Sequence, residues 1–114
     1  MSEDKDDQRL ETPDGRYIIV HGRLWRRANP GLSEEARLAL VKALMQARRA
    51  VKQALAVDDA DALASARRAV DGAKVALGER GPIWWDDGAP DENRRLVRNS
   101  SYAGWHKRVS AGAD

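Results

Sequence analysis

One segment of the chain carries basic side chains without any acidic ones. Between residues 36 and 57 the sequence carries five Lys or Arg and no acid. The segment has apolar residues at helical spacing, and a second helical pattern follows Asp58 and Asp59. In an antiparallel hairpin that turns there, the numbers of facing residues sum to about 116. The expected result is a basic cluster across both helices, made of Arg48, Arg49, Lys52, Arg67 and Arg68.

Such a cluster could bind phosphates, an anionic membrane surface or an acidic protein. Arginine supplies 15 of the 20 basic residues, and its planar guanidinium suits carboxylate, phosphate and nucleobase contacts. The alternative interpretation is a solvated face that keeps the protein soluble, in which Arg67 pairs with Asp71 one helical turn away. No zinc-finger, RNA-recognition or helix-turn-helix signature accompanies the cations.

A second group of candidate residues lies between residues 84 and 94. There, tryptophan could form an apolar wall, an aspartate could act as a carboxylate ligand, and arginine could contact an anion. Structural roles compete with this interpretation: Asp87-Gly88 suits a turn, Asp91 suits the first turn of a helix, and tryptophans commonly build a core. Two adjacent tryptophans cannot face the same way, so one of them is expected to be exposed. The residues of this alternative ligand loop are Trp84, Trp85, Asp87, Asp91 and Arg94.

Several kinds of chemistry are excluded by residue type. Without cysteine the chain has no disulfide, no thiolate nucleophile and no cysteine-based metal site. Its serines lack a nucleophile-elbow context, and there is no glycine-rich phosphate loop or dinucleotide fingerprint. We therefore expect no catalytic residue, no metal and no cofactor, and we favour a protein that is not an enzyme.

Length and composition indicate one small domain. The chain has 114 residues, of which 42% are hydrophobic and 33% charged, and its mean hydropathy is −0.67. No apolar run approaches the ~18 residues of a membrane span. Residues 1–11 are acidic and lack the apolar core of a signal peptide, so a cytoplasmic location is expected. The first twelve residues are predicted to be a disordered acidic tail, 13–110 a single domain, and 111–114 a frayed end.

The N-terminal part of the domain contains one β-branched run at residues 17–20. His21-Gly22 could supply the two left-handed positions of a tight hairpin turn into residues 23–26. The other possibility is one continuous extended segment. The prediction here is therefore a strand or a β-hairpin.

The two central helices are predicted at residues 33–57 and 59–77. Ser33 and Asp59 mark their starts, and Gly78 ends the second. On the first helix a leucine-rich arc and an alanine-rich arc lie side by side. The alanine side permits close approach of the second helix, whereas the leucine side needs a larger apolar partner, either the tryptophan-containing flanks or a second copy. A homodimer through this helix is one expectation.

The C-terminal part is predicted to hold two short helices. One spans residues 91–98 after Pro90, and the last is capped by Ser100-Ser101 and carries Tyr102, Trp105 and Val109. The expected fold is mainly α: a long antiparallel helical hairpin with an N-terminal strand or β-hairpin and two short C-terminal helices.

Short motifs along the whole domain resemble a family of short bacterial proteins of uncharacterised function. They are Asp14-Gly15-Arg16-Tyr17-Ile18, Gly22-Arg23-Leu24-Trp25-Arg26, Asn29-Pro30, Leu44-Met45-x-Ala47-Arg48-Arg49-Ala50-Val51, Ala76-Leu77-Gly78-Glu79-Arg80-Gly81-Pro82, Trp84-Trp85-x-Asp87-Gly88-Ala89-Pro90-Asp91-x-Asn93-Arg94, Asn99 and Tyr102-Ala103-x-Trp105.

Some members of that family carry names related to biphenyl-2,3-diol 1,2-dioxygenases. Extradiol ring cleavage needs ferrous iron held by two histidines and a carboxylate. The only histidines are His21 and His106, one at a predicted turn and one beside Trp105, and they form no metal-spaced pair. Dioxygenase activity is therefore not expected.

The leading functional expectation is a non-enzymatic interaction module that presents a basic helical face to an acidic protein or nucleic acid. The alternative is a small metabolite-binding protein or enzyme with its site in the loop between Trp84 and Arg94.

Overall fold

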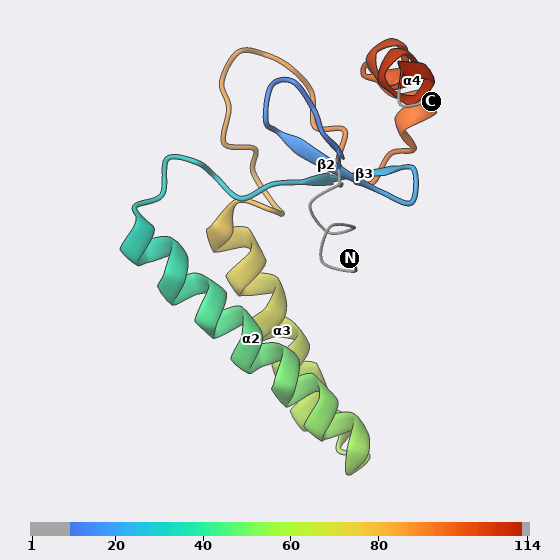
Figure 1. Ribbon diagram of the computed structural model, residues 1–114. Helices are drawn as coiled ribbons and strands as arrows, with labels where there is room; N and C mark the ends of the chain where they lie inside the picture. The colour runs from blue at the N-terminus through green and yellow to red at the C-terminus, as the bar shows by residue number, and fades with distance from the viewer. Residues whose placement is uncertain (1–9, 113–114) are drawn as a thin grey trace. The chain divides into compact units, whose positions relative to one another are not determined.

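The computed structural model describes residues 10–112 of the chain. These residues form two compact units. The sheet unit contains residues 10–27 and 87–112, and the hairpin unit contains residues 28–86. Figure 1 shows the β-strands and the C-terminal helix in the first unit and the two long helices in the second.

The sheet unit is built on three antiparallel strands in the order β1-β2-β3. They are β1 (Leu10–Glu11), β2 (Tyr17–Val20) and β3 (Arg23–Arg26). The turn between β2 and β3 consists of His21 and Gly22, whose φ angles are 52° and 77°. Both residues occupy the left-handed region that a two-residue hairpin turn requires. The predicted hairpin is therefore confirmed, and the continuous extended segment is wrong.

The first strand lies before the predicted domain boundary at residue 13. Residues 1–9 of the predicted tail lie outside the described residues. Leu10 and Glu11, however, pair with Ile19 and Ile18 of β2. Thr12 is buried, and its backbone N–H donates to the Tyr17 carbonyl at 2.9 Å. Leu10 and Glu11 thus belong to the sheet, and Thr12 follows β1 and satisfies a further backbone group of β2.

Residues 93–97 run along the free edge of β3. The backbone N–H of Leu24 donates to the Arg95 carbonyl at 2.9 Å, and that of Arg94 donates to the Leu24 carbonyl at 2.7 Å. This extended path replaces the helix predicted over 91–98, of which only the 3₁₀ turn η1 (Val97–Asn99) forms. The helix prediction was wrong because Arg94 has a left-handed φ of 74° and the unpaired strand edge competes for the same backbone groups.

The last helix, α4 (Ala103–Gly112), is confirmed. The hydroxyl oxygen of Ser100 accepts the Tyr102 N–H at 3.1 Å, which orders the chain just before the helix. Of the predicted frayed end, residues 111 and 112 belong to α4. Residues 113 and 114 lie outside the described part.

The hairpin unit consists of α2 (Glu34–Ala56) and α3 (Ala60–Leu77). Ser33 accepts the Ala36 N–H at 3.1 Å, and Asp59 accepts the Ala62 N–H at 3.0 Å. These side chains satisfy backbone donors that have no partner within their helices. Gly78 ends α3 with a left-handed φ of 92°. The predicted helical hairpin is therefore confirmed.

The leucine-rich arc of α2 faces α3. Leu44 is buried with Ala73 and Leu77 of α3, and Leu40 and Val41 pack against this cluster. The leucine side was expected to need the tryptophan-containing flanks or a second copy as its partner. Leu44 instead packs against Ala73 and Leu77 of α3, because α3 offers leucine and valine as well as alanine along the contact. Leu55, in contrast, is 56% exposed.

The fold is mainly helical, as predicted, with an antiparallel sheet in its N-terminal part and a 3₁₀ turn followed by a helix at its C-terminal end. Within residues 10–112, none of the helices combines the length and the apolar character needed to cross a bilayer.

Candidate functional site

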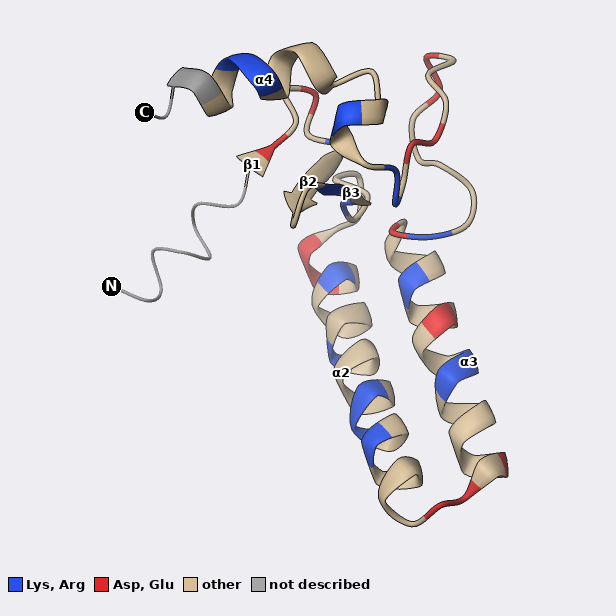
Figure 2. Cartoon of the chain, turned by 90° about the vertical axis from the view of Figure 1, so that its right-hand side faces the viewer, with Lys and Arg blue, Asp and Glu red and all other residues tan. Residues whose placement is uncertain are grey.

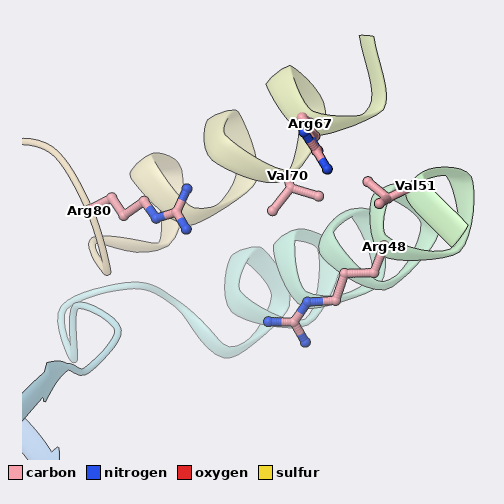
Figure 3. A pocket seen from close by; sticks show the side chains of 5 residues that line it. All are labelled: Arg48, Val51, Arg67, Val70 and Arg80. Carbon is pink, nitrogen blue, oxygen red and sulfur yellow. The ribbon is translucent and has the colours of Figure 1, made fainter. Parts of the chain in front are cut away.

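A cavity of about 390 Å³ lies on the flank of the helical hairpin. It is partly open to solvent, and its lining combines three arginines with two valines. Figure 3 shows Arg67 and Val70 extending from α3, Arg48 and Val51 from α2, and Arg80 from the segment after α3.

A repeated pentapeptide explains why both helices line this cavity in the same way. Ala-Arg-Arg-Ala-Val occurs at residues 47–51 and again at 66–70. The first alanine of each copy, Ala47 or Ala66, is buried between the helices. The next residue is an arginine at the border of that contact, and the valine one turn further lies on the same side. Each copy therefore contributes one guanidinium and one apolar side chain to the cavity.

The second arginine of each copy lies elsewhere. Arg49 and Arg68 follow the lining arginines by about 100° around their helices, which turns them further from the contact between α2 and α3. Both are exposed, as is Lys52, and none of the three lines the cavity. Of the five predicted cations, the structure thus brings Arg48 and Arg67 together at the cavity. Figure 2 shows Lys and Arg positions spread along the length of α2.

Arg80 is a cavity residue that the sequence analysis missed. Its Nη1 donates to Asp71 Oδ1 at 3.0 Å, so Asp71 pairs with Arg80 and the predicted Arg67–Asp71 pair was wrong. The left-handed Gly78 turns the chain after α3, and this turn carries Arg80 back along the helix. The glycine was recognised as a helix stop, but helical periodicity says nothing about the direction of the chain beyond it.

The pKa of Lys74 on α3 is affected by the charges on the same flank. Burial lowers the pKa of its ammonium group, and the positive charges of Arg80 and Arg48 lower it further, against the opposing effect of Glu79. A cation whose charged form is disfavoured by two neighbouring cations lies in a region of positive potential. The charges of Arg80 and Arg48 thus act together at the position of Lys74.

The side chains that line the cavity are suited to binding a ligand through charge and apolar contact. Guanidinium groups stay charged at every physiological pH, so they do not exchange protons as general acids or bases. The valines offer only apolar contact. The lining thus suits an anion that also has an apolar surface.

The sheet unit contains a separate network of buried polar groups. Arg26 has a fully buried side chain, and its Nη1 donates to Asp91 Oδ2 at 2.9 Å. The Tyr17 hydroxyl donates to Asp91 Oδ1 at 3.4 Å and accepts the Glu92 N–H at 2.8 Å. Burial raises the pKa of Tyr17 to about 12. The Asn93 side chain accepts the Arg26 N–H at 2.8 Å, so residues 91–93 are fixed to β2 and β3.

A second part of this network centres on Asp14. Tyr102 donates to its Oδ2 at 2.6 Å, and Thr12 donates to its Oδ1 at 2.7 Å. Burial opposes ionisation of Asp14, but hydrogen bonds from Tyr102, Thr12 and the Arg16 N–H outweigh it and lower the pKa of this carboxyl. Arg16 in turn pairs with Asp87, which lowers the pKa of Asp87.

Glu92 completes the network. It is buried, its Oε1 accepts the Ser101 N–H at 2.9 Å, and its Oε2 accepts the Ser101 hydroxyl. Over residues 10–112, every buried side-chain nitrogen and oxygen has a hydrogen-bond partner. Polar groups that are satisfied internally hold a fold together and leave little capacity for a ligand. We interpret this network as the attachment of the C-terminal segment to the sheet.

The predicted ligand loop divides between the two units. Trp84 and Trp85 belong to the hairpin unit, where their rings meet edge to face with centroids 5.0 Å apart. Trp85 is buried and Trp84 is partly buried. In the sheet unit, Asp87 and Asp91 bind arginines, as described above. Arg94 takes part through its backbone, since its carbonyl accepts Arg23 Nη1 at 2.6 Å.

The remaining aromatic residues and the histidines lie in the sheet unit. Tyr17 and Tyr102 pack edge to face at 5.6 Å. Trp25 on β3 is 39% exposed, which makes it one of the more accessible aromatic side chains. His21 forms the hairpin turn and His106 lies in α4. Among the described residues, no group of three or more His, Cys, Asp or Glu is arranged to hold a metal ion.

Comparisons with family models, with curated proteins and with solved structures found no match. The family resemblance of the sequence motifs therefore stays a prediction.

Proposed function

We propose that this protein is a non-enzymatic binding module whose helical hairpin presents a basic face to a polyanionic partner, either a nucleic acid or an acidic protein. The observation that carries the proposal is the cavity in which Arg48, Arg67 and Arg80 from separate segments surround one space. These three arginines are exposed, and exposed cations that were scattered over a surface would only keep the protein soluble. Cations that converge on a shared cavity are typical of a site that holds an anion.

Charge composition supports the same proposal. From Ala36 to Ala56, α2 carries no acidic side chain, so no carboxylate along that stretch of the helix competes with an external anion. Arginine binds phosphate and carboxylate through two parallel hydrogen bonds, which gives geometric selectivity as well as charge attraction.

The test is binding across a salt series. A labelled single-stranded oligonucleotide, a duplex and a poly-glutamate peptide would be titrated at low ionic strength, with circular dichroism as a folding control. We expect binding that weakens as salt increases, with a slope near −2 for single strands, because about three phosphates would be neutralised. Changing Arg48, Arg49, Arg67 and Arg68 to Glu should abolish it.

The results distinguish a nucleic acid from an acidic protein as the partner. Binding of the peptide alone would favour an acidic protein over a nucleic acid. Absence of binding to all three probes, or binding that the four substitutions leave unchanged, would contradict the proposal.

Homodimerisation through α2 is a second proposal, and it rests on side chains outside the predicted leucine arc. Leu38 and Met45 are 52% and 45% exposed, and their separation of two turns places them on one face of the helix. Light scattering after size-exclusion chromatography tests it. A monomer mass at high protein concentration would contradict it.

A further inference from the structure

We infer that the cavity on the helical hairpin binds one unpaired nucleotide of a single-stranded nucleic acid. Its phosphate would lie among the guanidinium groups of Arg48, Arg67 and Arg80, and its base against Val51 and Val70. This inference rests on the proposed polyanion binding and names the partner. It follows from the mixed lining of the cavity, which consists of three arginines, called here the cationic rim, and two valines, called here the apolar floor.

The cationic rim comes from three different segments. Arg48 lies on α2, Arg67 on α3, and Arg80 two residues after the glycine that ends α3. A phosphate group has oxygens pointing in several directions, so it can accept hydrogen bonds from guanidiniums on different sides. Lys74 on α3 lies close enough to this rim that the charges of Arg80 and Arg48 lower its pKa, after the larger effect of burial.

The apolar floor distinguishes a nucleotide from a bare phosphate. Val51 and Val70 are partly exposed, and Val70 also packs against the core cluster of the hairpin. A phosphate ion would leave both valines in contact with water. A base or sugar attached to the phosphate would cover them, and burial of apolar surface stabilises the complex. Arginine side chains also stack on the faces of bases.

The size of the cavity favours the binding of a single nucleotide. Its volume of about 390 Å³ lies near the lower end of the range of small-molecule sites, which is about 300 to 1,000 Å³. In a duplex the bases are stacked and paired inside the helix, so only phosphates and groove edges would reach the protein. An unpaired base can turn outward and enter a pocket. The floor would therefore contribute to binding of single strands and not of duplexes.

The pair between Arg80 and Asp71 does not prevent ligand binding. The two side chains are 46% and 60% exposed, and exposed ion pairs contribute little free energy. An incoming phosphate can share Arg80 with Asp71 or replace that carboxylate.

The first experiment titrates the full-length protein with inorganic phosphate, a nucleoside and the corresponding nucleoside monophosphate, followed by calorimetry or by amide chemical shifts. We expect the monophosphate to bind at least about tenfold tighter than phosphate or nucleoside, with shift changes at residues around Val51 and Val70. Equal affinities of phosphate and monophosphate would overturn the inference, because the floor would then contribute nothing.

The second experiment tests the floor directly with a matched pair of variants. Val51→Ser should reduce the preference for the monophosphate over phosphate, whereas Val57→Ser, at an exposed valine beyond the end of α2, should leave that preference unchanged. Thermal unfolding verifies that both variants fold. If the two variants show the same preference, the inference is overturned.

The third comparison separates this inference from the proposed function. A single strand should bind more tightly than a duplex of the same length, and Arg48→Gln with Arg67→Gln should remove that difference. Equal binding of both forms would overturn the inference while polyanion binding stands. Failure of every polyanion to bind would overturn both.

Discussion

Arg26 and Asp91 form an ion pair in which the arginine side chain is fully buried and its Nη1 lies 2.9 Å from Asp91 Oδ2. The arginine belongs to β3, and the aspartate precedes the segment that runs along β3. The pair therefore joins two parts of the sheet unit that are 65 residues apart in the sequence.

Asp91→Asn should lower the free energy of unfolding by about 2 kcal/mol, because it removes an anionic partner of a buried guanidinium. The figure lies below the range for a fully buried pair, since the Asp91 side chain is 40% exposed. Urea denaturation measures it. Asp86→Asn, at an exposed aspartate, is the control and should change stability by less than about 0.5 kcal/mol. Equal effects of both substitutions would contradict the role of the pair.

Two glycines of the hairpin unit should respond in opposite ways to alanine. At Gly78, with φ at +92°, an added Cβ would lie 2.9 Å from Trp84 and 3.1 Å from the Asn29 backbone nitrogen. Gly78→Ala should therefore destabilise the protein by more than about 1 kcal/mol. Gly72 lies inside α3 with open space around it, so Gly72→Ala should stabilise by about 0.5 to 1 kcal/mol. Thermal unfolding checks both, and a stable Gly78→Ala variant would contradict the tight turn.

Acid should weaken the sheet unit through Asp14. Its pKa is lower in the folded state than its ordinary value of 3.8, so the folded protein holds fewer protons than the unfolded chain in that range. The resulting stabilisation is present above pH ~3.8 and is lost as pH falls through the lower, folded-state pKa. Asp14→Asn should reduce the loss of stability between neutral pH and pH ~3. Urea unfolding at both pH values measures it, and an unchanged pH dependence would contradict this role of Asp14.

Asp71 should limit anion binding at the cavity because it pairs with Arg80. Asp71→Asn should increase the affinity for a single-stranded oligonucleotide about two- to fivefold at low salt, the range expected for release of an exposed ion pair. Asp61→Asn changes the net charge equally near the start of α3, away from the cavity lining, and should have a smaller effect. Fluorescence anisotropy measures both. Equal gains would show that net charge alone determines the affinity.

The regular elements of this fold could be predicted from local sequence signals. Ser33, Asp59 and Gly78 define helix ends through backbone chemistry that acts over a few residues. His21-Gly22 identifies the hairpin turn in the same way. The segment around Arg94 could not be predicted from such signals, because its conformation depends on pairing with a distant strand edge and on Asp91 and Glu92 binding partners elsewhere in the sheet unit.

The candidate site could be predicted in part. Counting along an antiparallel hairpin placed Arg48 level with Arg67, and the cavity contains both. The same counting also selected Arg49 and Arg68. Counting gives the height of a residue along the helix axis, but it does not give the direction in which its side chain points around that axis. Arg80 required knowledge of where the chain goes after Gly78, which depends on tertiary contacts with Asn29 and Trp84.

The most direct test of the central claim compares two double variants that remove the same charge from the same helices. Arg48→Gln with Arg67→Gln changes the cavity, and Arg49→Gln with Arg68→Gln changes the neighbouring positions outside it. With a labelled single-stranded oligonucleotide at low salt, the first pair should lower affinity at least about tenfold, and the second should lower it by about twofold or less. Equal losses in the two variants would show that diffuse charge, and not the cavity, binds the partner.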